Sequence, residues 1–100
     1  MIRHVVMWRL KNEAEGGTKQ ENMEKMAADL YALRPIIPEI LRMEIGFDVS
    51  HTEMSADFVL LTEFDSLEAL HTYAVHPEHQ LVAKYVRSVI DSRTVIDTEI

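Results

Sequence analysis

The sequence predicts one α+β domain over residues 1–100, with four strands and two helical segments in the order β-α-β-β-α-β. Two observations support this fold class. Apolar and polar residues alternate in four separate segments, which is the period of a strand. Two of the segments between them carry apolar residues at helical spacing, and capping residues and prolines mark where those helices begin and end. A chain of 100 residues suffices for a single hydrophobic core.

The first half of the chain is predicted to form a strand, a helix and a second strand. Residues 2–10 alternate along the first strand, and the polar segment 11–17 is predicted to be a loop. Thr18 and Glu21 make a capping box, in which each side chain bonds the other residue's backbone N–H, so a helix is predicted to begin there. Two later prolines end that helix. The second strand is predicted over residues 41–47.

The second half is predicted to form a strand, a divided helical segment and a last strand. Residues 58–64 alternate as the third strand. Asp65 and Glu68 form another capping box, which predicts that a short helix begins there. Pro77 lacks a backbone N–H and has a fixed φ angle, so it suits the first position of a helix and divides this helical segment in two. The fourth strand is predicted over residues 94–100.

The predicted order is that of the ferredoxin-like motif, an antiparallel sheet with helices on one face. Its usual strand order, 4-1-3-2, places the first and third strands in the centre. Both of these strands carry apolar residues on both faces, with Val5, Met7, Val59 and Leu61 opposite Val6, Trp8, Phe58 and Leu60. Helices on one side cannot cover both faces, and an exposed apolar face usually marks an interface. We therefore predict a homodimer, in which a second copy of the chain covers the remaining face.

Composition and charge exclude several classes of function. The formal net charge of −7 argues against nucleic acid or an anionic membrane as a partner. No run approaches the length of about 18 apolar residues that a membrane span requires. The absence of cysteine rules out disulfides and thiolate chemistry, and it suits a cytoplasmic protein. No glycine-rich phosphate loop or serine nucleophile motif occurs, and we expect no cofactor.

The segment from His71 to His79 concentrates side chains that can transfer protons. It holds three imidazoles, the phenol of Tyr73 and the helix-breaking Pro77. His79 falls in the first turn after this proline, where the positive end of the helix dipole disfavours the imidazolium. The neighbouring Val82 also removes this residue from water, so we predict a lowered pKa for His79 and a neutral imidazole that accepts a proton. Tyr73, on the other side of the break, is placed to donate a hydrogen bond to a substrate carbonyl or to that imidazole.

Three residues are candidates for catalysis. His79 would be the general base, Tyr73 the hydrogen-bond donor and His4 a group that positions the substrate. His4 lies on the same face of the first strand as Trp8. The alternative role of His4 is that of a buried strand histidine that donates to a backbone carbonyl, and the alternative for Tyr73 is a plug in the seam between helix and sheet.

We also expect Trp8, Phe58 and His76 to contact the substrate. His76 is further expected to mark the helix boundary before the proline and to be a poor side-chain cap. A metal site of His76, Glu78 and His79 is an alternative, since two imidazoles and a carboxylate suit zinc or iron. Their spacing is not the i, i+4 pair on one helix that usually sets two imidazole ligands, so we predict no metal site.

Four stretches of the chain carry a family resemblance: residues 2–6, residues 64–70, the cluster Tyr73-x-x-His76-Pro77-x-His79, and residues 95–97. In these stretches the chain resembles the stress-responsive α/β-barrel domain family, a branch of the dimeric ferredoxin-like barrels. The resemblance covers essentially the whole chain, and the Tyr/His/Pro cluster is its most specific part. It implies a homodimer whose two sheets face each other as a barrel.

The resemblance also implies a function in outline. One plant branch of this family consists of polyketide cyclases, which close a poly-β-keto chain by aldol condensation without a cofactor. In that branch the residues matching Tyr73 and His79 carry the acid–base chemistry, and a histidine matching His4 lines the cavity. The chain departs from these cyclases at Phe58, where they have another histidine.

Two functions stay open at this point. The first is a protein that binds a small molecule and acts on its carbonyl group as a cofactor-independent lyase, cyclase or isomerase. The second is a non-catalytic, stress-associated homodimer, in which the same residues form a packed polar seam. A third function, that of the haem-degrading or quinone-forming monooxygenases of related barrels, has no supporting motif in this sequence.

Overall fold

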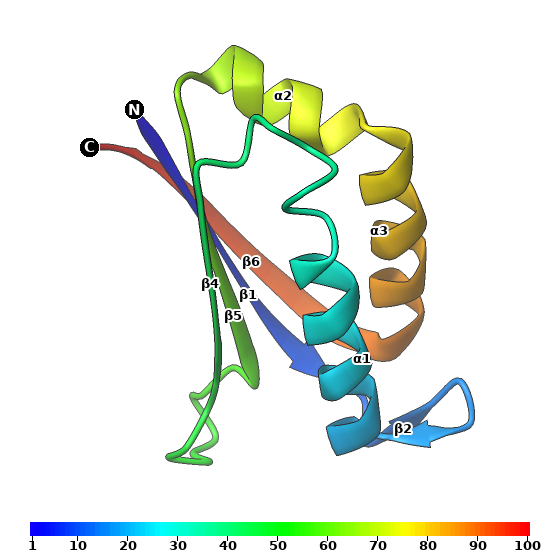
Figure 1. The fold of residues 1–100 in the computed structure, drawn as a ribbon. Coiled ribbons are helices and arrows are strands. Elements are labelled where there is room, and N and C mark those ends of the chain that lie inside the picture. The colour runs from blue at the N-terminus through cyan, green and yellow to red at the C-terminus, as the bar shows by residue number, and fades with distance from the viewer.

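The computed structural model describes residues 1–100 and places three helices on one face of a four-stranded antiparallel sheet (Figure 1). The strands are β1 (Ile2–Leu10), β2 (Glu13–Ala14), β3 (Gly17–Thr18), β4 (Arg42–Phe47), β5 (Phe58–Phe64) and β6 (Ile90–Glu99). The helices are α1 (Lys19–Tyr31), α2 (Leu67–Val75) and α3 (Pro77–Val89). The sheet order is β4-β5-β1-β6, which confirms the predicted ferredoxin-like order. None of the helices is long and apolar enough to cross a membrane.

The hydrophobic core lies between the helices and the sheet. Every second side chain of β1 is buried on this side, namely Ile2, His4, Val6, Trp8 and Leu10. Met26 of α1 and Val89 of α3 are fully buried against the same face. Because β1 lies between β5 and β6, these alternate side chains occupy the middle of the core.

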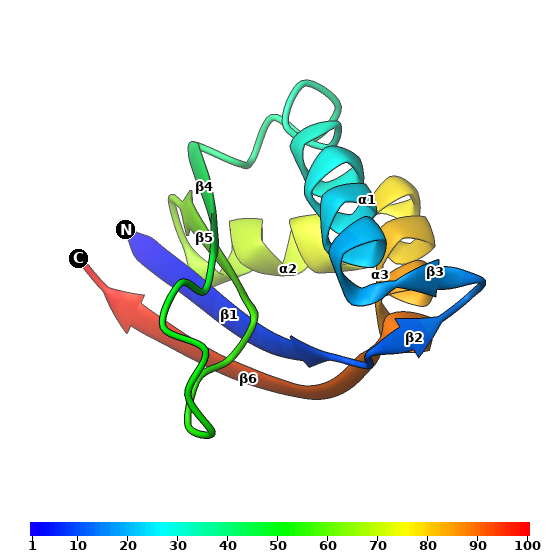
Figure 2. The ribbon, with the colours of Figure 1, turned by 90° about the horizontal axis from the view of Figure 1, so that it is seen from below.

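The opposite face of the sheet carries no helix (Figure 2). The apolar side chains on this outer face are only partly covered, and they lie on neighbouring positions of the three paired strands: Val5, Met7, Val59, Leu61 and Ile96. Ion pairs of Glu63 with Arg3 and Arg42 border this apolar area. The central strands therefore carry apolar residues on both faces, as predicted, and in a single protomer no helix covers the outer face.

Two predicted boundaries are wrong. The segment 11–17, predicted to be a loop, contains the short hairpin β2–β3, whose turn includes Gly16 with a φ of 74°. β6 begins at Ile90, directly after α3, and not at residue 94. This strand lies at the edge of the sheet, and most of its side chains are exposed. Its first residues can therefore be polar, and without apolar alternation the sequence gives no strand signal there.

The helix caps agree with the prediction for α1 only. Thr18 and Glu21 form the predicted capping box. The cap of α2 is Ser66, whose Oγ accepts a hydrogen bond from the Ala69 N–H at 3.1 Å. The predicted cap, Asp65, precedes this residue and lies outside the helix. Both residues are of types that cap helices well, and the helix predicted from Asp65 and Glu68 begins one residue too early.

Replacing Ser66 tests this assignment. We expect Ser66→Ala to lower the free energy of unfolding by about 1 kcal/mol, because an N–H at the start of α2 loses its acceptor. Asp65→Ala should change stability by less than about 0.5 kcal/mol, as is usual for exposed positions. Urea unfolding of both variants measures the difference, and a larger loss for Asp65→Ala than for Ser66→Ala would contradict the assignment.

Candidate functional site

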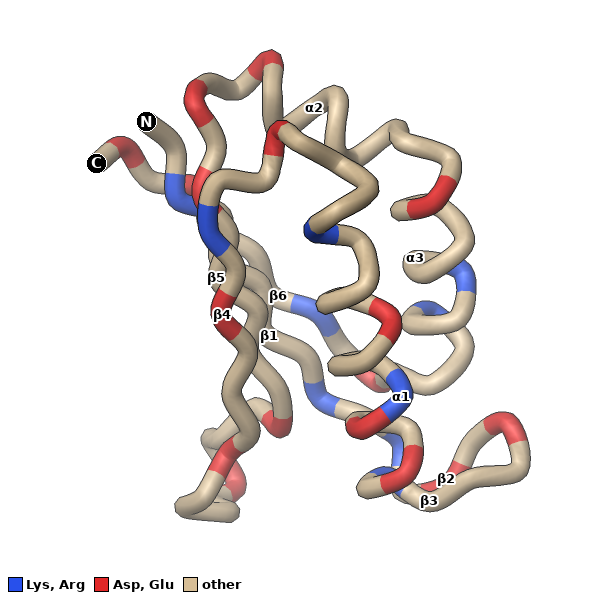
Figure 3. Tube along the Cα trace, in the orientation of Figure 1, with Lys and Arg blue, Asp and Glu red and all other residues tan.

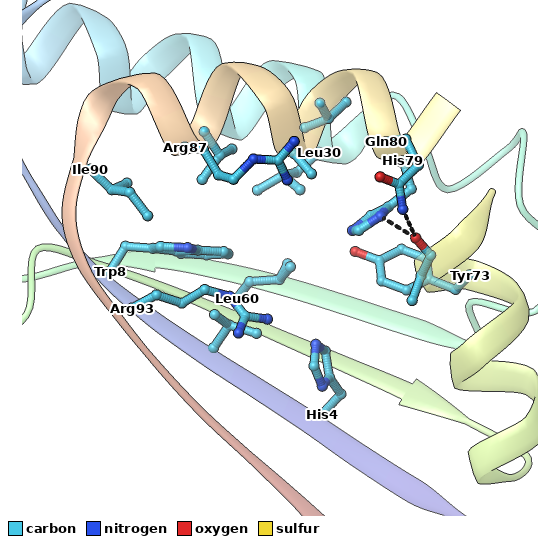
Figure 4. Close-up of a pocket in the computed structure, with 15 residues that line it drawn as sticks. His4, Trp8, Leu30, Leu60, Tyr73, His79, Gln80, Arg87, Ile90 and Arg93 are labelled. Atoms are coloured by element: carbon cyan, nitrogen blue, oxygen red, sulfur yellow. Dashed lines mark hydrogen bonds between the residues drawn. The ribbon is translucent and has the colours of Figure 1, made fainter. Parts of the chain in front are cut away.

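A cavity of about 410 Å³ lies between α3 and the helix-facing side of the sheet (Figure 4). Ligand sites commonly enclose about 300–1,000 Å³, so this volume suits a small molecule. The apolar part of the lining comes from the sheet, α1 and α3, and includes Val6, Leu30, Leu60, Val82, Val86 and Ile90. His4, Tyr73 and His79, the three predicted catalytic residues, all line this one cavity. Figure 4 shows them towards one end, with Trp8 towards the other.

The break at Pro77 brings Tyr73 and His79 together. α2 ends at Val75, α3 begins at Pro77, and the residue between them caps both helices. Tyr73 therefore belongs to the last turn of α2 and His79 to the first turn of α3. The centroids of their rings lie 4.3 Å apart, with the ring planes at 52°.

The Tyr73 side chain is buried, at 2% exposure, and its ring also packs against Phe64 at 5.1 Å. The residue lines the cavity, and its hydroxyl makes no hydrogen bond within the protein. Burial raises the pKa of Tyr73 to about 12, and the positive charge of Arg93 opposes this only in part. Tyr73 therefore keeps its proton at neutral pH and can donate a hydrogen bond to a molecule in the cavity.

The His79 imidazole is held in one tautomer by the end of α2. Its Nδ1 lies 3.0 Å from the carbonyl oxygen of Ala74. A carbonyl can only accept, so Nδ1 carries the hydrogen, and the other ring nitrogen, Nε2, has a free lone pair when the ring is neutral. Burial lowers the pKa of His79 from its ordinary value of 6.5; the bond to Ala74 opposes this shift, whereas His4 and Arg93 add to it. The predicted direction of the shift is confirmed, and burial is its largest cause.

His4 is bonded to a carboxylate from the neighbouring strand. Its Nδ1 lies 2.5 Å from Oδ1 of Asp97, its partner in the β1–β6 register. The predicted alternative, a buried histidine that donates to a backbone carbonyl, is therefore wrong. Asp97 is partly exposed, so it accepts this bond without the cost of a fully buried charge. The carboxylate fixes the orientation of the His4 ring at the margin of the cavity.

The three predicted substrate-binding residues have different positions. Trp8 lines the cavity, whereas Phe58 and His76 do not. Phe58 packs edge-on against Trp8, with the ring centroids 5.5 Å apart, so it supports the cavity wall from behind. His76 caps α3 through Nδ1, which accepts from the Glu78 N–H at 3.1 Å, and the prediction of a poor side-chain cap is wrong. No group of three or more histidine or acidic side chains is arranged to hold a metal ion.

Three polar residues of the lining were not predicted from the sequence: Arg93, Arg87 and Gln80. Arg93 was missed because the start of β6 was predicted too late. With β6 placed from Ile90, Arg93 pairs with Trp8 across β1 and β6. Arg93 then lies on the same face of the sheet as Trp8, which is the face turned to the helices.

Comparison with known proteins gives a family match. The sequence model of the family described as "Stress responsive A/B Barrel Domain" matches residues 2–100. No curated protein sequence matches the chain.

Solved structures match over almost the whole chain. A dimeric protein of ferredoxin-like fold from Bacteroides fragilis is 27% identical, with 99% of this chain and 95% of that chain covered and a TM-score of 0.84. A dimeric ferredoxin-like protein from Thermobifida fusca is 21% identical, with 99% and 90% covered and a TM-score of 0.84. A hydroxynitrile lyase from Passiflora edulis is 20% identical, with 99% and 92% covered and a TM-score of 0.85. At such identities the last two show a shared fold alone.

The lowered pKa of His79 predicts a pH dependence of stability. The unfolded chain takes up a proton at this residue near pH 6.5, whereas the folded chain resists protonation to a lower pH. The contribution of His79 to stability is thus complete above about pH 6.5 and is lost as the pH falls towards the folded-state pKa. Urea unfolding at a series of pH values should show this loss, and His79→Gln should remove part of it.

His71→Gln is the matched control, because His71 is exposed on α2 and lies outside this cavity. This variant should keep the wild-type pH dependence. An unchanged pH dependence in His79→Gln would show that the folded protein does not resist protonation of His79.

Proposed function

The chain belongs to the stress-responsive A/B barrel domain family, and from this membership and the geometry of its cavity we propose that it binds a small carbonyl compound. It acts on this compound as a cofactor-independent lyase, cyclase or isomerase. The observation that carries the proposal is the Tyr73–His79 pair, in which burial keeps the phenol protonated and the imidazole neutral. Two adjacent titratable groups whose pKa values are shifted in opposite directions are typical of an acid–base pair. The hydroxynitrile lyase from Passiflora edulis is an example of a lyase with this fold.

The proposed reaction begins with proton abstraction by His79. Its Nε2 takes a proton from the carbon next to the substrate carbonyl, and the electron pair of that C–H bond moves towards the carbonyl oxygen. The Tyr73 hydroxyl donates a hydrogen bond to this oxygen as its negative charge grows. The imidazolium then returns its proton to the product, which restores neutral His79. The cycle consumes no oxidant or reductant.

His4 has a positioning role in this proposal. Its Nδ1–H donates to Asp97, so the ring is held in one orientation and Nε2 is left to contact a bound molecule. Trp8 supplies a flat apolar wall, which is supported from behind by Phe58. Both residues thus restrict where the carbonyl group can lie relative to His79.

A non-catalytic, ligand-binding homodimer is the second candidate function. It is favoured by the close packing of Tyr73 between Phe64 and His79, which is also the arrangement of a structural seam. In that case the two rings stabilise the junction of α2 and α3, and the cavity holds a molecule without changing it.

We further propose that the chain forms a homodimer through the outer face of its sheet. The related structures from Bacteroides fragilis and Thermobifida fusca are described as dimeric. In this chain the partly exposed Val5, Met7 and Leu61 lie together on that face. Covering each such side chain contributes about 1.5–3 kcal/mol when burial is complete, which favours association of two copies.

Two substitutions test the acid–base pair. We expect His79→Ala to slow the exchange of the α-hydrogens of small ketones for deuterium in heavy water by about 10²–10⁴-fold, the usual contribution of a positioned general base. Tyr73→Phe should slow the exchange by a similar or smaller factor, since only a hydroxyl that bonds nothing in the protein is lost. Nuclear magnetic resonance spectra of the ketones give the rates.

The matched controls are His51→Asn, in the loop after β4, and Tyr31→Phe, which change exposed residues of the same types that line no cavity with Tyr73 or His79. Both should exchange deuterium at the wild-type rate. Thermal unfolding is measured on every variant. A large loss of stability in His79→Ala and Tyr73→Phe without a specific loss of exchange would favour the structural seam over the catalytic pair.

The dimer is tested by sedimentation. At low micromolar concentration the wild-type chain should sediment as a dimer, and high salt should leave it intact because apolar burial holds it. Met7→Lys should shift the equilibrium towards the monomer, since it places a charge in the interface. Met54→Lys, at a position that is 92% exposed in the loop after β4, should not. A folded wild-type monomer under these conditions would refute the proposal.

A further inference from the structure

Two arginines in the cavity lining lack a partner within the protein. Arg87 of α3 and Arg93 of β6 line the cavity where it opens to solvent: both residues are exposed, and neither makes a hydrogen bond or an ion pair within the protein. Every other arginine of the chain bonds a carboxylate or a backbone carbonyl: Arg3, Arg9, Arg34 and Arg42. The two unpartnered guanidinium groups are therefore those at the cavity.

No acidic side chain lines this cavity, although the chain contains 17 of them. Figure 3 shows basic positions on both α3 and β6, the elements that bound the cavity. Asp97, which lies on the same face of β6 as Arg93, already accepts the bond from His4. In a protein of net charge −7, the lining of this cavity thus carries two positive charges that form no ion pair.

The position of Arg93 relates this charge to the acid–base pair. Its positive charge favours a lower pKa at both residues: it adds to the shift of His79 and opposes in part the upward shift of Tyr73. Arg93 therefore acts within the same site. Figure 4 shows the Arg93 side chain between Trp8 and the end of the cavity that holds Tyr73 and His79. A ligand that reaches from one end of the cavity to the other therefore passes Arg93.

Trp8 forms one end of the cavity wall. Its Nε1–H is buried and has no acceptor in the protein, which is uncommon in native proteins. Trp8 and Arg93 are direct partners across β1 and β6, so their side chains leave the same face of the sheet at neighbouring positions.

We propose that the ligand of this cavity is an organic carboxylate with an apolar body, whose carboxylate is bound by Arg93. This inference rests on the proposed function only for the place of the reacting carbonyl, which lies at Tyr73 and His79. The planar guanidinium offers two parallel N–H groups that match the two oxygens of a carboxylate. Arg87 adds a second positive charge from α3, and the aliphatic side chains of the lining cover the rest of the molecule. The substrate class is thus a carbonyl compound that also carries a carboxylate.

The experiment compares benzoate with benzamide, which has the same shape without the charge. Trp8 is the only tryptophan, so its fluorescence and its indole N–H resonance report binding in this cavity. We expect benzoate to bind more tightly than benzamide. Arg93→Gln should weaken the binding of benzoate by about 10- to 100-fold, which is the range expected when a hydrogen bond to a charged group is lost. The binding of benzamide should not change. The affinity of Arg93→Lys for benzoate should lie between those of the wild type and Arg93→Gln, because lysine keeps the positive charge and lacks the planar guanidinium.

Lys84→Gln is the matched control, since it removes one positive charge from an exposed position of α3 outside the cavity lining. It should bind benzoate as the wild type does. Equal affinity for benzoate and benzamide, or wild-type affinity in Arg93→Gln, would overturn the inference and leave the proposed function standing. Tighter binding of phenyl phosphate than of benzoate, dependent on Arg93, would overturn the assignment to carboxylates. Loss of deuterium exchange in His79→Ala together with equal benzoate and benzamide binding would separate the two proposals.

Discussion

The proline break between α2 and α3 is the constraint on which the candidate site depends. In an uninterrupted helix the Ala74 carbonyl would accept from the Glu78 N–H, but that N–H instead donates to Nδ1 of His76. The Ala74 carbonyl is therefore free, and it accepts from His79 and from the side chain of Gln80. The break thus changes the direction of the chain, supplies the acceptor that fixes the His79 tautomer, and brings the Tyr73 ring to the His79 ring.

Burial affects the two members of this pair in opposite ways. Removal from water disfavours whichever form of a group is charged, so it raises the pKa of the Tyr73 phenol and lowers that of the His79 imidazole. Both groups are consequently neutral over a wide range of pH. The unpartnered charge of Arg93 acts on both from the opposite wall of the cavity. Burial therefore dominates the pKa of both groups, and at His79 the Ala74 carbonyl, His4 and Arg93 make smaller contributions.

Much of this could be predicted from the sequence because its signals are local. The alternation of β1, the capping box at Thr18 and the break at Pro77 each follow from a few adjacent residues, and together they imply the sheet order. The structure brings His4, Tyr73 and His79 to one cavity, and their catalytic roles stay a prediction. Phe58 and His76 lie outside that cavity, because Phe58 packs against Trp8 on the neighbouring strand and the His76 side chain caps α3.

Arg93 could not be found in the same way. It lies in the part of β6 that has no apolar alternation, because an edge strand needs none. Its place beside Trp8 depends on the register between strands that are far apart in sequence. Pairing of this kind is the part of a fold that local patterns describe least.

The pairing of β1 with β6 has a consequence for how the molecule forms. His4 and Asp97 are 93 positions apart, so β1 can pair with β6 only after all the other elements have been synthesised. Closing so long a loop costs chain entropy before any contact offsets it, which slows folding of domains dominated by non-local contacts. While the chain is still being made on the ribosome, β1 lacks one of its two neighbours, and its apolar residues remain a target for chaperones. The cavity is complete only once β6 has paired with β1 and placed Arg93 opposite Trp8.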